Sequence, residues 1–365
     1  MSSLRLLHLI HTPRHSGAEM LVYELCRLHC AWGHDCAIAS FAPSQSEFLK
    51  EAAELERLGV ALYFPERAKV KLSRTFHYRD AVKHFQPDFV FGQASIPSLY
   101  GRFATGWGRK RLPYASVMHS ASNDDFALPY FSLAERLTRF LVDHVVAVSD
   151  MAATNYIRRF GLGIPVSIIK NGINVERFAK IDRIFVRHEL KIDSSTRLVL
   201  QVGRICDTKQ QMLSLTAMRP LLDNGSVLLW FAGLAEDRAY EECLKKMTTE
   251  WGLDHAVRFL GSRSDVPNLL AAADLYLMPS RHEAHSVAIL EALVSGVPII
   301  ASDIPAFNFA REMPAVRICG VEDESAWTVS IRDMLAEPRV TRASAAFAIE
   351  RTAQAYLDVA RQGRR

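Results

Sequence analysis

The sequence predicts an α/β protein made of two doubly wound, Rossmann-like domains, each with a mostly parallel sheet. Short apolar runs alternate with amphipathic segments along the chain, which is the pattern of strand–helix–strand units. This alternation restarts after a polar stretch at residues 171–195. The length of 365 residues also fits two domains. A single eightfold barrel is an alternative at this length, but the polar stretch interrupts the even repeats that a barrel requires.

In the first half, seven apolar runs are expected to be strands, with amphipathic helices between them. The strands are expected at Leu4–Ile10, Cys36–Phe41, Val60–Phe64, Asp88–Gly92, Ala115–His119, His144–Val148 and Val166–Ile169. Helices are expected at Ala18–Cys30, Glu47–Leu58 and Ser132–Leu141, among others.

The second half repeats the pattern. Strands are expected at Arg197–Val202, Ser226–Ala232, Val257–Leu260, Leu275–Met278 and Pro298–Ala301, and helices at Gln210–Leu222, Tyr240–Trp251, Pro267–Ala272 and Val287–Ser295. Several of these strands are continuously apolar, as expected when helices cover both faces of a sheet.

The domain boundary is expected near the turn signal Asn171–Gly172. We therefore predict an N-terminal domain at residues 1–172 and a C-terminal domain at 173–340. Residues 341–365 are expected to form a C-terminal helix that packs back on the N-terminal domain.

The composition is that of an ordinary globular protein, with 49% hydrophobic and 23% charged residues. Six cysteines are too few for a disulfide scaffold, and no apolar run reaches the roughly 18 residues of a membrane span. We therefore expect a reduced, cytoplasmic protein. Residues 1–170 carry 20 Lys and Arg against 15 Asp and Glu, which suits an anionic partner surface.

Two strand ends carry residues that suit a phosphate ligand. The first expected strand leads through HTPRHSGAE, with Gly17, into a helix whose positive end favours an anion. The second domain opens with LVLQVGRICDTK, in which Arg204 and Lys209 follow the first strand. Ligands of open α/β sheets bind at such strand ends, and Arg and Lys together suit a diphosphate.

The segment EAHSVAILEALVSGVPIIASD carries two carboxylates, Glu283 and Glu291. Eight helical residues would separate them by roughly 12 Å. That exceeds the roughly 5–9.5 Å of hydrolytic carboxylate pairs, so a glycosidase dyad is not expected. Carboxylates this far apart can instead hold two parts of one elongated ligand.

These residues resemble the retaining glycosyltransferases of family 4, also called group 1, which have the GT-B fold. The resemblance rests on the E-x7-E pair Glu283 and Glu291, the VGRICDTK and HSGAE loops and the segment KNGINVERF, in the family's order from Leu4 to about residue 310. It implies two Rossmann-like domains facing a central cleft. The chain has Ser16–Gly17 where many members have Gly-Gly, and Ala284–His285–Ser286 where many have Gly-Phe-Gly.

The resemblance also implies roles for individual residues. Glu291 is expected to accept hydrogen bonds from the ribose of the nucleotide, and Glu283 and His119 to contact the donor sugar. The catalytic set is then Glu283, His119, Arg204 and Lys209, with the two cations neutralising the diphosphate. The remaining donor-binding positions are expected to be Gly17, Arg263, Val266, Ala284, His285, Ser286 and Val287.

The implied reaction moves a sugar from a nucleotide diphosphate, UDP or GDP, to a hydroxyl of a glycan or lipid-linked glycan, as in polysaccharide or lipopolysaccharide synthesis. The sequence holds no Asp-x-Asp pair, so no metal and no cofactor are expected. Preorganised cations and a helix dipole stabilise the charge that develops on the leaving diphosphate.

Two basic stretches in the first half suit an anionic membrane or a lipid-phosphate acceptor, or else form a solvated face. They comprise Arg67, Lys69 and Lys71, and Arg102, Trp107, Arg109, Lys110 and Arg111. Nucleic acid is not an expected partner. Two other functions stay open: a nucleotide-sugar epimerase on the same fold, and a non-catalytic partner subunit.

Overall fold

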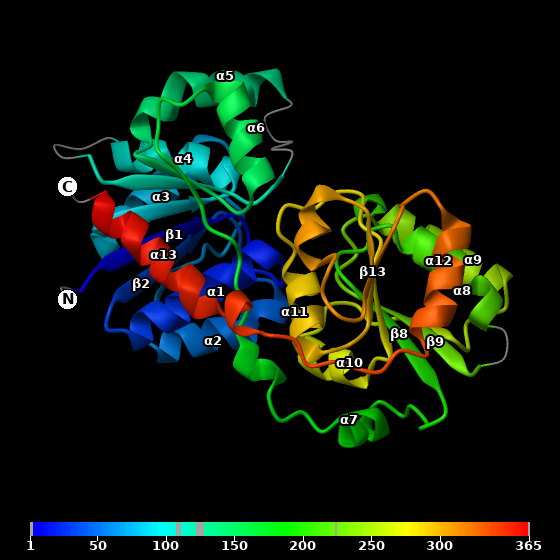
Figure 1. Ribbon diagram of the computed structural model, residues 1–365. Helices are drawn as coiled ribbons and strands as arrows, with labels where there is room; N and C mark the ends of the chain where they lie inside the picture. Colours follow the sequence, from blue (N-terminus) through cyan, green and yellow to red (C-terminus); the bar gives the residue numbers. More distant parts are fainter. Residues whose placement is uncertain (1–2, 107–110, 122–127, 223–224, 364–365) are drawn as a thin grey trace. The chain divides into compact units, whose positions relative to one another are not determined.

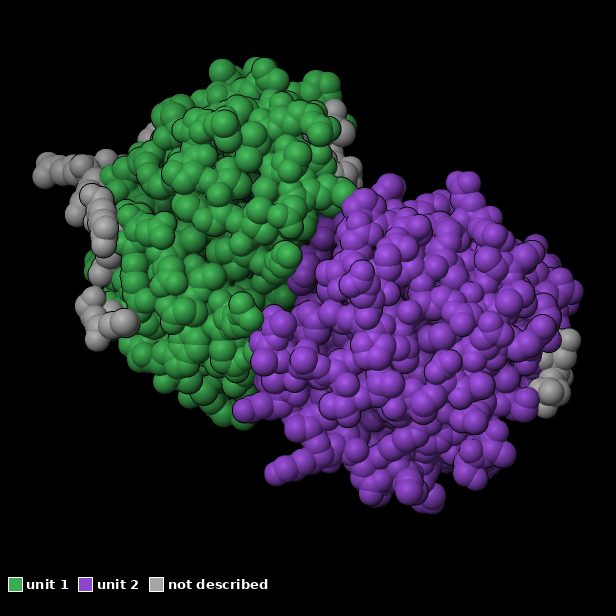
Figure 2. Space-filling view, in the orientation of Figure 1, with its two compact units in different colours: residues 1–172, 348–365 green, residues 173–347 purple. Residues whose placement is uncertain are grey.

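The computed structural model describes residues 3–106, 111–121, 128–222 and 225–363. The chain forms two compact units, one of residues 1–172 with 348–365 and one of residues 173–347 (Figure 2). Among the described residues, no helix has the length and apolar character needed to cross a bilayer.

Unit 1 contains a seven-stranded parallel sheet in the order β3-β2-β1-β4-β5-β6-β7 (Figure 1). The strands are β1 (Arg5–Ile10), β2 (Asp35–Ser40), β3 (Ala61–Tyr63), β4 (Phe89–Gln93), β5 (Tyr114–Met118), β6 (His144–Ala147) and β7 (Val166–Ile168). The helices are α1 (Gly17–Ala31), α2 (Leu49–Arg57), α3 (Leu72–Phe85), α4 (Ser95–Gly106), α5 (Pro129–Thr138), α6 (Asp150–Phe160) and α13 (Ile349–Gln362).

Unit 2 contains a six-stranded parallel sheet in the order β10-β9-β8-β11-β12-β13. The strands are β8 (Arg197–Val202), β9 (Val227–Ala232), β10 (Val257–Phe259), β11 (Leu275–Met278), β12 (Ile299–Ser302) and β13 (Val316–Cys319). The helices are α7 (Arg183–Glu189), α8 (Gln211–Leu222), α9 (Arg238–Glu250), α10 (Val266–Ala272), α11 (Val287–Ser295) and α12 (Glu324–Met334).

The central strands are buried on both faces, which explains their continuous apolar sequences. In β1, every residue from Leu6 to Ile10 is buried, and in β11 every residue is buried. Each sheet therefore divides its unit into two apolar cores, one on each side. Because all strands of a sheet are parallel, the loops that follow them gather at one edge, where ligands of such sheets bind.

The end of the chain divides differently from the sequence prediction. Residues 341–347 belong to unit 2, and α13 begins only at Ile349. The reason is that Arg342 donates hydrogen bonds to the carbonyl oxygens of Leu293, Val297 and Pro314, which bind this segment to unit 2. The final helix α13 packs on α1 within unit 1 through Ile349, Ala353 and Tyr356.

Candidate active site

The candidate site lies where the strand order of unit 2 reverses. The chain leaves β8 for β9 on one side, and β11 pairs with β8 on the other side. Such a switch point opens a crevice between the loops that follow the two strands, and ligands of open α/β sheets bind there. The loop after β8 carries Arg204 and Lys209, and the loop after β11 carries Glu283.

Lys209 and Glu283 form an ion pair across this switch point. Both side chains are nearly buried, with 12% and 11% exposed. The backbone of Lys209 is held by β8, because the Gln201 side chain donates a hydrogen bond to the Lys209 carbonyl oxygen at 2.7 Å. Ser214 of α8 in turn donates to the Gln201 amide oxygen at 2.7 Å. The Lys209 ammonium therefore lies beside the Glu283 carboxylate, while hydrogen bonds from β8 and α8 hold the Lys209 backbone in place.

Further contacts join the two loops. The Arg281 amide donates to the Thr208 carbonyl oxygen at 3.0 Å, and the Arg281 side chain pairs with Asp207 at 2.7 Å. The loop after β9 also lies directly against the loop after β8. A Cβ at Gly233 would lie 1.9 Å from the Gly203 carbonyl oxygen, so this position requires glycine.

Tyr276 of β11 shows that the two predicted glutamates face the same region. Its hydroxyl donates to the Val202 carbonyl oxygen at 3.2 Å. Burial raises the pKa of Tyr276 well above its ordinary value, and the carboxylates of Glu291 and Glu283 raise it further. Both carboxylates therefore lie close enough to act on this buried ring.

Residues 284–287 lead into the N-terminus of α11. The side chain of Ser286 occupies the cap position but does not cap the helix. The amides at this end, with the positive end of the helix dipole, are suited to an anionic ligand. The His285 ring stacks on Phe309 with 5.8 Å between ring centroids, which orients the imidazole.

Two other predicted donor contacts, Arg204 and Arg263, lie on loops of unit 2, where nearby carboxylates pair with them. Arg204 pairs with Glu236 in the loop after β9. Arg263 binds both carboxylate oxygens of Asp265, at 2.7 and 2.6 Å, and this hydrogen bonding raises the pKa of Arg263. Val266 is the first residue of α10 and packs on the core of unit 2.

In unit 1, His119 directly follows β5 and belongs to a buried polar chain. Its Nε2 lies 2.8 Å from the Gln93 amide oxygen, and the Gln93 amide nitrogen lies 3.0 Å from His8 Nδ1. Burial lowers the pKa of His119 to about 4, so the imidazole is neutral at physiological pH. Since the Gln93 oxygen can only accept, the His119 proton resides on Nε2 and leaves Nδ1 as an acceptor.

The sequence did not single out Gln93, although it ends β4, the neighbour of β1 and β5. Polar side chains in three adjacent strands are the signal that would have found this chain. Gly17 is the first residue of α1, next to Ser16, whose hydroxyl donates to Glu19.

The structure places the residues of the two predicted basic stretches in different environments. Arg67, Lys69 and Lys71 lie in the partly exposed loop before α3. The prediction that Arg102 belongs to an exposed basic surface is wrong, because its side chain is fully buried in an ion pair with Glu135 at 2.8 Å. Arg111 is partly exposed and pairs with Asp143. Trp107, Arg109 and Lys110 lie outside the described residues.

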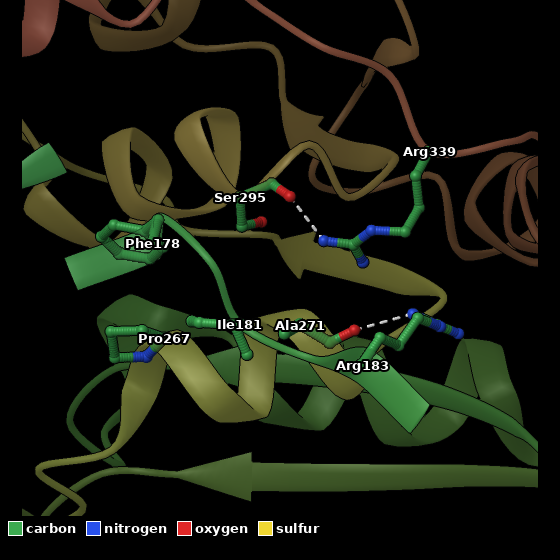
Figure 3. Close-up of a pocket in the computed structure, with 7 residues that line it drawn as sticks. All are labelled: Phe178, Ile181, Arg183, Pro267, Ala271, Ser295 and Arg339. Carbon is green, nitrogen blue, oxygen red and sulfur yellow. Dashed lines mark hydrogen bonds between the residues drawn. The ribbon is translucent and has the colours of Figure 1, made fainter. Parts of the chain in front are cut away.

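Unit 2 also holds a cavity of about 150 Å³, which Arg183 and Arg339 line together with Ala271 and Ser295 (Figure 3). Its arginines bind carbonyl oxygens at the carboxyl ends of two helices. Arg183 donates to Ala271 at the end of α10, and Arg339 donates to Ser295 at the end of α11. These arginines stabilise helix ends, and none of the residues that line the cavity is a predicted site residue.

Comparison with known proteins gives two family matches. Residues 15–177 match the model described as Glycosyltransferase Family 4, and residues 182–313 match the model described as Glycosyl transferases group 1. Together these segments cover most of the chain, one in each half.

Known relatives carry related names. The chain is 27% identical over 248 residues to a lipopolysaccharide core mannosyltransferase of Rhizobium meliloti, covering 61% of this chain and 67% of that protein. It is 25% identical over 311 residues to an N,N'-diacetylbacillosaminyl-diphospho-undecaprenol N-acetylgalactosaminyltransferase of Campylobacter jejuni, covering 79% of each. Other relatives match over about half of their length or less.

Solved structures agree in fold. HepE of Anabaena, crystallised with UDP and glucose, superposes with a TM-score of 0.81 at 19% identity, covering 98% of this chain and all of that one. The lipopolysaccharide glycosyltransferase WaaG gives a TM-score of 0.71 at 17% identity and 98% coverage of both chains. With its two Rossmann-like sheets and a family match in each half, the chain belongs to the family 4, group 1 glycosyltransferases of the GT-B fold.

Proposed function

We propose that the protein transfers a hexosyl group from a nucleoside diphosphate sugar to a hydroxyl of a lipid-linked glycan. We further propose that the transfer retains the anomeric configuration, requires no metal ion and takes place at the cytoplasmic face of a membrane. The observation that carries the proposal is the nearly buried Lys209–Glu283 ion pair at the switch point of unit 2.

The pair suits a donor that brings both a diphosphate and a sugar. Departure of the diphosphate builds negative charge on its oxygens, and we propose that the Lys209 ammonium and the α11 N-terminus stabilise that charge. When the diphosphate takes over Lys209, the Glu283 carboxylate becomes available to accept hydrogen bonds from sugar hydroxyls. Glu291, one helix segment further, is proposed to bind the ribose.

The relatives support the choice of substrates. The Campylobacter enzyme is named for a diphospho-undecaprenol acceptor, and HepE was crystallised with UDP-glucose. We therefore propose UDP- or GDP-linked hexoses as donors and a polyprenyl-diphosphate or lipopolysaccharide glycan as acceptor.

The test combines donor binding with turnover by the full chain. UDP-glucose, UDP-galactose, UDP-N-acetylgalactosamine and GDP-mannose are screened by thermal shift, and donor cleavage is measured with and without EDTA. We expect one donor to stabilise the protein, EDTA to leave the rate unchanged, and the product linkage to keep the donor's anomeric configuration by NMR. Conversion of the donor to its epimer without acceptor would contradict the proposal.

Matched lysine variants test the site itself. Lys209→Gln should lower kcat by about 10²–10³-fold, as for other groups that stabilise developing charge. Lys245→Gln is the control, because Lys245 also pairs with a glutamate, Glu241, but does so on the surface of α9. Equal kcat values for the two variants would remove Lys209 from the mechanism.

A further inference from the structure

The outer face of α5 and the short helix η3 (Arg139–Leu141) carries large apolar side chains where most surface helices carry polar ones. Tyr130, Leu133, Leu137 and Phe140 follow one another at intervals of three, four and three residues, which places them along one side of the helix. These four residues are 57–70% exposed.

This stripe is not the core face of α5. On the core side, Phe131 packs on the apolar core of unit 1, and Glu135 is buried between Arg102 and the Tyr156 hydroxyl. The helix therefore makes its packing contacts through other residues and leaves the apolar stripe toward solvent. Contiguous apolar patches of this kind on a soluble domain mark interaction sites.

Arginines border the stripe. Arg136 is exposed on α5 and reaches the Arg159 carbonyl oxygen of α6 at 3.4 Å, so the end of α6 lies beside it. Arg158 is also exposed, at the same end of α6. The single acidic residue of α5, Glu135, is buried and contributes no negative charge to this surface.

We propose that the α5 face, defined as Tyr130, Leu133, Leu137 and Phe140 with Arg136 and Arg158, docks on an anionic lipid bilayer. Apolar side chains enter the acyl boundary while the arginines bind lipid phosphates. Self-association fits this surface less well, because a second copy would bring the same positive charge to it, whereas lipid phosphates complement Arg136 and Arg158. The assignment rests on the proposed function in one respect, since a lipid-borne acceptor gives the surface its use.

The test measures co-sedimentation of the full chain with vesicles of phosphatidylcholine, with and without phosphatidylglycerol. Leu137→Gln/Phe140→Gln should bind anionic vesicles at least about tenfold more weakly. The matched control is Ile184→Gln/Phe185→Gln on α7, whose side chains are 82% and 63% exposed but lie in unit 2. Arg136→Gln/Arg158→Gln should lose the preference for phosphatidylglycerol and the salt dependence.

Three results would overturn the proposal. One is equal binding by wild type and Leu137→Gln/Phe140→Gln, with circular dichroism showing that the variant is folded. Another is loss of binding in Leu72→Gln/Phe76→Gln on α3 instead. The third is a dimer in sedimentation velocity that Leu137→Gln/Phe140→Gln dissociates without changing vesicle binding. The vesicles contain no acceptor or nucleotide-sugar, so these results are independent of sugar transfer.

Discussion

Gln93 controls which nitrogen of His119 can accept a hydrogen bond. Its amide oxygen accepts from His119 Nε2, and its amide nitrogen donates to His8 Nδ1. His8 is fully buried, and its ring stacks on Phe91 with 5.1 Å between ring centroids. The end of this hydrogen-bonded series away from His119 is therefore held in place. The neutral His119 then offers Nδ1 to a hydroxyl hydrogen.

We predict that Gln93→Glu raises the pKa of His119 from about 4 toward its ordinary value of 6.5, because a carboxylate favours the imidazolium. The protonated ring loses its acceptor at Nδ1, so transferase activity should fall at a higher pH than in wild type. Titration of His119 by ¹⁵N NMR and the pH profile of kcat measure the two effects. Gln93→Leu is the control, since it introduces no charge and should leave the acid limb in place.

Among individual residues, the sequence predicted the site residues that lie in loops of distinctive composition. It missed those whose role depends on which strands lie side by side. Lys209 and Glu283 follow strands in loops of distinctive composition, and the structure brings them together. Gln93 and Gln201 lie in strands that are otherwise mostly apolar. Their partners lie 26 and 8 residues away in sequence, so only the folded sheet reveals their roles.

Among the elements, α10 ends at an arginine cluster around a single buried carboxylate. Asp274 follows α10 and accepts hydrogen bonds from Arg183, Arg187 and Arg197, as well as from the Leu198 amide at 2.8 Å. Its side chain is 7% exposed. The carboxylate thus neutralises cations that also bind the carbonyl oxygens at the end of α10.

We predict that Asp274→Asn destabilises unit 2 by about 3–5 kcal/mol, because it leaves the buried Arg187 without its counter-ion. Urea denaturation measures the free energy of unfolding. The control is Asp303→Asn, which breaks the exposed pair with Arg311 and should cost no more than about 1 kcal/mol. A similar cost for both variants would show that Asp274 is not needed as a counter-ion.

The sequence predicted the apolar strands, including those of three residues, and missed elements whose sequences are more polar. The polar stretch at residues 171–195, in which no helix was expected, contains α7, whose Ile184 and Phe185 are exposed. β13 was not among the strands expected in the second half. The helix expected from residue 341 starts later because arginine side chains, which carry no periodic signal, anchor residues 339–342 to unit 2.

For the whole molecule, buried histidines make unit 1 sensitive to acid. Burial lowers the pKa of His8 to about 3 and those of His29 and His119 to about 4, against an ordinary value of 6.5. Unfolding therefore takes up protons below about pH 6.5, and stability is lost as pH falls toward 4.

We predict that shifting the pH from 7 to 5 lowers the free energy of unfolding of unit 1 by on the order of 1–2 kcal/mol per histidine. Hydrogen exchange with mass spectrometry should show faster exchange in β1, β4 and β5 at pH 5, after correction for the intrinsic rate. His29→Asn should reduce this pH dependence. Identical protection at the two pH values would contradict the prediction.

At this scale the two-domain architecture was predictable, because the alternation of strands and helices restarts in the second half. That the last helix completes the first unit could be predicted only through the expectation that residues 341–365 pack back on the N-terminal domain.

The return of α13 to unit 1 has a consequence for synthesis on the ribosome. A first domain ordinarily folds as it emerges, at about 5–20 residues translated per second. Here the core of unit 1 lacks Ile349, Ala353 and Tyr356 until the ribosome has translated past unit 2. Unit 2, contained within residues 173–347, has its whole sequence first. For roughly 10–40 s at those rates, part of the apolar surface in the first half of the nascent chain therefore stays uncovered.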